Sequence, residues 1–154
     1  FKGFVNCFFL CFVEFSLAIY ILLAILFSVL FNSFKSYSFP PLLSIITSSS
    51  IFVFILLLFQ LVGISDPSFT LLNGLAVYSP FNIFFQALLF IIGSFILFLN
   101  RSYYSVRLLF QYEFDILLIF SFLALSALCF SNDFLFVYVI LELQSLAFYV
   151  LAGF

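Results

Sequence analysis

Long apolar runs alternate with short polar breaks along the chain, and this pattern predicts membrane-spanning helices. The runs cover residues 4–31, 42–64, 80–99, 113–130 and 133–154. A helix rises about 1.5 Å per residue, so a run of roughly 20 residues can cross a hydrocarbon core of about 30 Å. We therefore predict an all-α, polytopic transmembrane helix bundle of about five spans, forming a single transmembrane domain over residues 1–154.

The breaks between these runs contain residues that typically start or end helices. Pro40 and Pro41 precede the second run, and Ser79-Pro80 supplies an N-cap and a first-turn proline for the third. The segment between those two runs carries Asn73-Gly74, a turn signal. The tight turn Ser131-Asn132-Asp133 precedes the fifth run, and we expect Ser131 or Asn132 to cap that helix.

The composition excludes a water-soluble globular protein. Hydrophobic residues make up 68% of the chain and charged residues only 6%, and the mean hydropathy is +1.44. The net charge of −2 comes from four basic and six acidic residues, which gives no support to nucleic-acid binding. There are 29 Phe and no Met, Trp or His, a bias that indicates an AT-rich genome such as that of an organelle.

Residues that could hold a metal or a redox cofactor are scarce. Cys7, Cys11 and Cys129 have no metal-site or disulfide spacing, and without His there is no ordinary ligand set for zinc, haem or an iron–sulfur cluster. We interpret the cysteines as small apolar packing residues. The sequence predicts no metal site and no cofactor in this chain, so any electron carriers are expected in other chains.

Basic residues indicate an orientation in the membrane. Lys35, Arg101 and Arg107 follow the first and third runs, whereas the opposite side has only Lys2. The positive-inside rule then places the N-terminus on the outer face and Phe154 on the inner face.

Glu142 lies near the middle of the last apolar run. A central intramembrane carboxylate costs roughly 2.5 to 3.5 kcal/mol, so it must be neutral, paired or facing water. Helical spacing puts Tyr138, Ser145 and Tyr149 on the same face as Glu142. Intramembrane acids are usually functional, so we interpret Glu142 as a proton-pathway acid with this face as its support. A structural acid bonded to a neighbouring helix is the alternative.

The other polar residues of the apolar runs have less specific interpretations. We expect Glu14, in the first half of the first run, to be solvated or interfacial, with the bundle interior as the alternative. Glu113 and Asp115 begin the fourth run, where acids ordinarily serve as surface caps that favour the helix dipole. The run from Thr47 to Ser50 is expected to pack against another helix, with a water-lined cavity as the alternative.

The last third of the chain, from Tyr112 to Phe154, resembles a known family. The SND turn at Ser131 to Asp133 and the ELQSL run at Glu142 to Leu146 are similar to those of subunit 2 of proton-pumping NADH:ubiquinone oxidoreductase, respiratory complex I. Upstream the similarity is one of hydropathy and helix order. The resemblance implies the N-terminal part of an antiporter-like membrane subunit that contributes to proton translocation coupled to NADH:ubiquinone electron transfer, multi-pass in the mitochondrial inner membrane.

The resemblance also implies partners that this chain does not contain. In the family, the glutamate matched by Glu142 works with a lysine on the seventh helix, and no residue here can take that role. Either the chain is a fragment or the subunit is encoded in pieces, and we favour a split subunit. Expected partners are other complex I membrane subunits, especially a chain carrying the remaining helices and the partner lysine, together with membrane lipids.

Redox chemistry is expected elsewhere in such a complex. NADH, FMN, iron–sulfur clusters and ubiquinone would be bound by other subunits, so this chain alone has no redox active site. A non-catalytic membrane scaffold is the alternative function. A stand-alone secondary transporter is disfavoured, because the sequence shows neither an inverted repeat nor paired broken helices.

Overall fold

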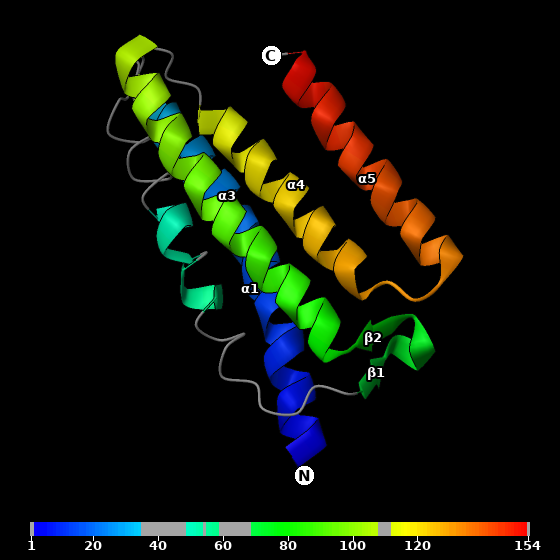
Figure 1. Cartoon of the computed structure of the whole chain (residues 1–154). Coiled ribbons are helices and arrows are strands. Elements are labelled where there is room, and N and C mark those ends of the chain that lie inside the picture. Colours follow the sequence, from blue (N-terminus) through cyan, green and yellow to red (C-terminus); the bar gives the residue numbers. More distant parts are fainter. Residues whose placement is uncertain (1, 35–48, 54, 59–68, 108–111, 154) are drawn as a thin grey trace.

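The computed structural model describes residues 2–34, 49–53, 55–58, 69–107 and 112–153. Its elements in chain order are α1 (Lys2–Phe34), a short helix within Ser49–Leu58, β1 (Phe69–Leu71), η1 (Leu72–Gly74), β2 (Ala76–Tyr78), α3 (Pro80–Arg107), α4 (Tyr112–Phe130) and α5 (Phe134–Ala152). The helices form one bundle with α5 at its edge, and the two termini lie at opposite ends (Figure 1). The prediction of a helical bundle is confirmed for the described residues, which contain five helices beside a small hairpin.

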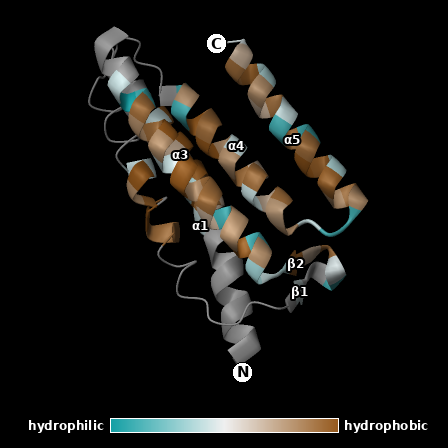
Figure 2. Ribbon diagram, in the orientation of Figure 1, coloured by the Kyte–Doolittle hydropathy of each residue, from teal (hydrophilic) through white to brown (hydrophobic). Residues whose placement is uncertain are grey.

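Among the residues whose side chains the structure describes, three helices are long and apolar enough to cross a membrane: Pro80–Ser102, Glu113–Phe130 and Phe134–Ala152. Of α1, the side chains of Glu14–Leu30 are described, and they form a further apolar stretch. Hydrophobic residues dominate these three helices along their length (Figure 2), and many large apolar side chains of α1, α3 and α5 are exposed. Such a surface suits lipid rather than water. The chain is a multi-pass membrane protein.

Helix bounds differ from the predicted ranges at several places. α1 covers Lys2–Phe34 instead of 4–31, and α3 continues to Arg107 instead of ending at 99. The extension of α3 runs through polar residues without Gly or Pro, so nothing in it breaks the helix after the apolar run stops. Of the predicted span 42–64, only 49–53 and 55–58 are described, and the remainder lies outside the described residues.

A small hairpin precedes α3, which the sequence did not predict as strands. β1 pairs antiparallel with β2, with Thr70 opposite Val77. Three residues per strand are too few to show the alternation by which strands are recognised. The turn signal is confirmed, since Asn73 (φ 56°) and Gly74 (φ 93°) both have left-handed backbone conformations.

The hairpin is joined to the turn between α4 and α5 through Asn132. The Asn132 backbone N–H donates to the Leu75 carbonyl oxygen at 2.9 Å, and its side-chain Nδ2 donates to the Gly74 carbonyl oxygen at 3.1 Å. The predicted cap by Ser131 or Asn132 was wrong. Asp133 is the N-cap residue of α5, without a side-chain cap bond, because Asn132 is committed to the hairpin and Ser131 Oγ donates to the Leu128 carbonyl oxygen at 2.7 Å.

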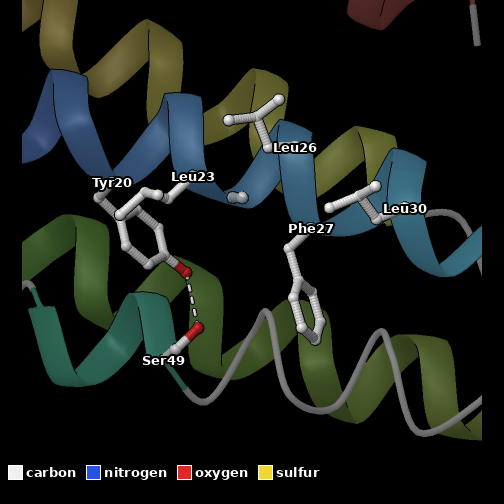
Figure 3. A pocket seen from close by; sticks show the side chains of 7 residues that line it. Tyr20, Leu23, Leu26, Phe27, Leu30 and Ser49 are labelled. Atoms are coloured by element: carbon white, nitrogen blue, oxygen red, sulfur yellow. Dashed lines mark hydrogen bonds between the residues drawn. The ribbon is translucent and has the colours of Figure 1, made fainter.

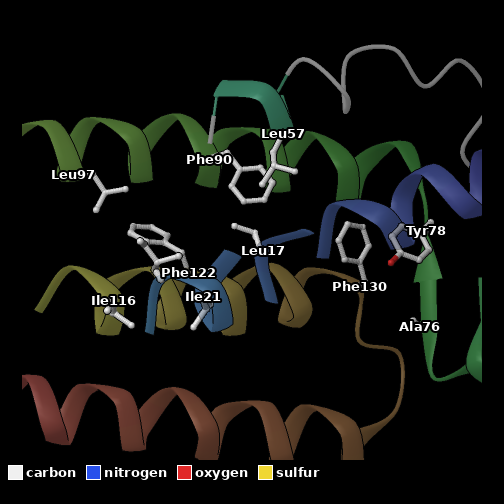
Figure 4. Close-up of a cluster of buried hydrophobic side chains, with 12 residues drawn as sticks. Leu17, Ile21, Leu57, Ala76, Tyr78, Phe90, Leu97, Ile116, Phe122 and Phe130 are labelled. Carbon is white, nitrogen blue, oxygen red and sulfur yellow. The ribbon is translucent and has the colours of Figure 1, made fainter. Parts of the chain in front are cut away.

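α4 lies at the centre of the bundle, in contact with α1, α3 and α5. Buried apolar side chains from α1, α3, α4, β2 and the short helix form the core of the bundle (Figure 4). At the hairpin end, the rings of Tyr78 and Phe130 lie 4.1 Å apart, centroid to centroid. On α1 the inward stripe follows heptad spacing, with these members: Glu14, Leu17, Ile21, Ala24 and Ser28. The core therefore fixes α4, which in turn positions α5.

Candidate functional site

α5 presents one face to α4 and leaves the other uncovered. Ile140 and Ala147 are its buried residues, and they lie seven residues apart. At about 100° per residue, these two share one side of the helix, whereas Glu142 lies about 200° from Ile140. Glu142 therefore points to the side of α5 opposite α4, and no other described element covers its exposed side chain.

The polar stripe predicted around Glu142 exists, but its members differ in what they contact. Tyr138 is 62% exposed and Tyr149 is 72% exposed, both on the uncovered side. The Tyr138 hydroxyl lies close enough to the Glu142 carboxyl group for a side-chain hydrogen bond. Ser145 Oγ instead donates to the backbone carbonyl oxygen of Glu142 at 2.8 Å. The structure thus brings Tyr138 and Glu142 together and directs the Ser145 hydroxyl to the backbone.

No counter-charge for Glu142 is found among the described side chains. α5 contains no basic residue. The side chains of Lys2, Lys35 and Arg107 are outside those that the structure describes, and Arg101, near the C-terminal end of α3, has an exposed side chain. Glu142 can therefore either hold a proton or pair with a cation that approaches from beyond this face. Both are reversible charge-neutralising events, as a proton pathway requires.

A second acid is buried where a surface cap was predicted. Asp115 is fully buried (0% exposed), while Glu113 two residues earlier is exposed, so the prediction was wrong for Asp115. The reason is helix phase, since Asp115 shares the inward face of α4 with Phe122, Ser126 and Cys129 at spacings of 7, 11 and 14 residues. That face could not be identified from the sequence, because the apolar residues of α4 are distributed around the whole helix.

Glu14 is also drawn into the bundle. It is only partly exposed, and its Oε1 atom is buried without a hydrogen-bond partner among the described residues. Glu14 interacts electrostatically with Cys129 of α4, which is a free thiol. The structure therefore favours the bundle-interior alternative for Glu14 over the interfacial position expected from the sequence.

Comparison with known proteins gives one informative match. No protein-family model matches the chain. A segment of 89 residues, 58% of this chain, is 35% identical to NADH-quinone oxidoreductase subunit N of Pelagibacter ubique (strain HTCC1062). The match covers 19% of that relative, so the chain spans about a fifth of its length. The chain has distant, partial homology to this subunit.

Proposed function

We propose, from this partial homology to an antiporter-like complex I membrane subunit, that the chain is part of such a subunit and that Glu142 is an acid of its proton pathway. The transport would be coupled to electron transfer from NADH to a quinone in other subunits. The compositional bias towards Phe favours an organellar location, the mitochondrial inner membrane.

The observation that carries the proposal is the position of Glu142. It lies in the middle of an apolar helix of 19 residues, on the side facing away from α4. Ionisation there without a partner costs roughly 2.5 to 3.5 kcal/mol. A cation about 4 Å away returns about 4 kcal/mol at an effective dielectric constant of 20. Because the two energies are of similar size, approach of one cation offsets the cost of a carboxylate at this position, and its withdrawal restores that cost.

Tyr138 supports this switching. A phenol hydroxyl can donate to the carboxylate and can accept from the protonated acid. The Tyr138 hydroxyl lies beside the Glu142 carboxyl group, so it can stabilise either protonation state. The basic partner is expected from a helix that covers the exposed side of α5, either in another chain or elsewhere in the same subunit.

The test is proton pumping by Glu142→Gln in the assembled complex in membranes. Protons moved per electron are measured with a pH-sensitive dye during NADH oxidation. We expect Glu142→Gln to assemble and to lose most coupled pumping, because the amide cannot ionise. Glu113→Gln makes the same chemical change at an exposed helix end and is expected to pump normally. Full pumping by Glu142→Gln would refute a direct role.

The scaffold alternative makes a different pair of predictions. The uncovered polar stripe of α5 is also what a helix interface would present. If Glu142 only locks such an interface, Glu142→Gln keeps normal activity, whereas Glu142→Ala loses assembly because its partner is left without a hydrogen bond. Native gels of both variants, run beside the pumping assay, separate the two functions.

A further inference from the structure

The interior of the bundle contains a carboxyl group that the pathway through Glu142 does not use. Asp115 of α4 is 0% exposed, and neither of its carboxylate oxygens has a hydrogen-bond partner among the described residues. Burying an isolated carboxylate is far more costly than burying a neutral acid, and a group in this position normally neutralises. Asp115 therefore needs a proton or a cation.

Hydroxyl groups from two other elements lie near this position without a hydrogen bond to Asp115 among the described residues. Asp115 interacts electrostatically with Tyr20 of α1. The hydroxyl oxygen of Tyr20 lies 2.7 Å from Ser49 Oγ (Figure 3), and it also interacts with Ser50, whose side chain is fully buried. Three elements, α1, the short helix within Ser49–Leu58 and α4, thus bring one acid and three hydroxyls together.

A cavity of about 490 Å³ lies beside this cluster, which we call the Asp115 cluster (Asp115, Tyr20, Ser49 and Ser50). Tyr20 and Ser49 supply the hydroxyls of the cavity wall, and the rest of the lining is apolar. The cavity is large relative to a water molecule, which occupies about 30 Å³ in the liquid. The Tyr20–Ser49 hydroxyl pair is therefore the polar part of an otherwise apolar cavity wall.

The charges around the Asp115 cluster favour a proton over a bound cation. Besides Asp115, the described side chains of α1, α3 and α4 include five titratable or charged groups: Glu14, Tyr20, Arg101, Glu113 and Cys129. Arg101 and Glu113 are exposed, and Glu14 lies beside Cys129 at the other end of α4 from Asp115. None is a buried base. A calcium or magnesium ion also requires at least about six oxygen ligands, more than the three hydroxyl oxygens and two carboxylate oxygens of this cluster.

We propose that the Asp115 cluster is a second proton-binding site, separate from Glu142. The Asp115 carboxylate takes one proton from hydronium, which leaves as water, and the site passes from a charge of −1 to neutral without any other bond changing. The hydroxyls of Tyr20, Ser49 and Ser50 do not bond the carboxyl group, so a proton is what neutralises Asp115 among the described residues. Asp115 lies three residues inside α4, about 4.5 Å along the helix axis from the residue at which that helix begins.

The site is independent of the pathway proposed for Glu142. Asp115 lies on the face of α4 turned towards α1, whereas Glu142 lies on the far side of α5. Loss of pumping in Glu142→Gln therefore leaves protonation of Asp115 unchanged. Conversely, failure of the Asp115 proposal says nothing against a role for Glu142.

Infrared difference spectroscopy of the assembled protein in membranes tests the proposal directly. A protonated carboxyl group in apolar surroundings shows a carbonyl-stretch band that ionised carboxylates lack. We expect Asp115→Asn to lose one such band at neutral pH, while Glu142→Gln and Glu113→Gln keep it. Alkaline titration of the wild type is expected to remove the same band. Retention of every carbonyl band in Asp115→Asn would overturn the proposal, because Asp115 would then be ionised.

Two further measurements cover other outcomes. If Asp115→Asn does not assemble, Asp115→Glu is used, and it is expected to shift one carbonyl-stretch band because the protonated carboxyl group moves within its apolar surroundings. Unshifted carbonyl bands in Asp115→Glu overturn the proposal. Sodium or potassium chloride added at constant pH is expected to leave the band unchanged, and its replacement by carboxylate absorption would identify a metal-cation site instead.

Discussion

Enlarging Ala147 is the most direct test of how α5 is held against the bundle. Ala147 is 3% exposed and, with Ile140, forms the buried face of α5. Ala147→Leu adds three carbon atoms where the helix meets α4. Overpacking of this kind typically costs about 1 to 3 kcal/mol, which corresponds to a roughly 5- to 140-fold change in the folding equilibrium.

Ala147→Leu should also affect Glu142, although the two side chains are not in contact. Ala147 and Glu142 lie on opposite sides of α5, so a leucine that pushes α5 away from α4 also moves the Glu142 carboxyl group. Small residues at membrane helix interfaces allow close approach of backbones. Under the proposed function, we therefore expect Ala147→Leu to lower coupled pumping as well as stability.

Thermal unfolding in detergent micelles measures the stability part. The matched control is Ala152→Leu, which makes the same substitution at an exposed position of the same helix. We expect the control to unfold like the wild type and Ala147→Leu to unfold at a lower temperature. Equal unfolding temperatures for the two variants would show that α5 does not pack on α4 through Ala147. The conclusion that Glu142 lies on the side of α5 opposite α4 would then be wrong.

Two other substitutions have matched controls. Tyr20→Phe removes the hydroxyl that bonds Ser49 at 2.7 Å and should lower the free energy of unfolding by about 0.5 to 1.5 kcal/mol. Tyr138→Phe changes a 62% exposed side chain and should leave stability nearly unchanged. Thermal unfolding compares the two variants, and equal losses would contradict a stabilising hydrogen bond between Tyr20 and Ser49. Gly74→Ala should lower the free energy of unfolding by about 1 to 2 kcal/mol, because an alanine is strained at the φ of +93° found here. An added Cβ atom would meet no neighbouring atom within 4 Å, so the backbone conformation alone causes this cost. Gly153→Ala, at a helical φ of −78°, should be neutral, and hydrogen exchange of the hairpin should rise only in Gly74→Ala.

The helices themselves were predictable because hydropathy is a local property. Apolar runs of sufficient length must form helices in a membrane, since the backbone has no water to bond. The same reasoning located Glu142 and placed Tyr138 on its face, because helical periodicity needs no knowledge of neighbours. The turn at Asn73-Gly74 was likewise readable, as few residues tolerate a left-handed backbone.

Packing partners were not predictable in the same way. Asn132 could equally have capped α5, and its actual bond to Gly74 joins residues 58 positions apart. Asp115 has the features of an ordinary first-turn acid until α1 is seen lying against its face of α4. A side chain's local role depends on sequence neighbours, whereas its burial depends on which distant element covers it.

By itself, the sequence determined that this protein crosses a membrane several times as helices and carries an acid in the middle of its last apolar run, because helix formation and transfer into lipid are decided by neighbouring residues. Only the tertiary structure decided that Glu142 turns away from α4 while Asp115 turns into the bundle. Which side of a helix is covered depends on contacts between distant segments, and these follow from packing of the whole core.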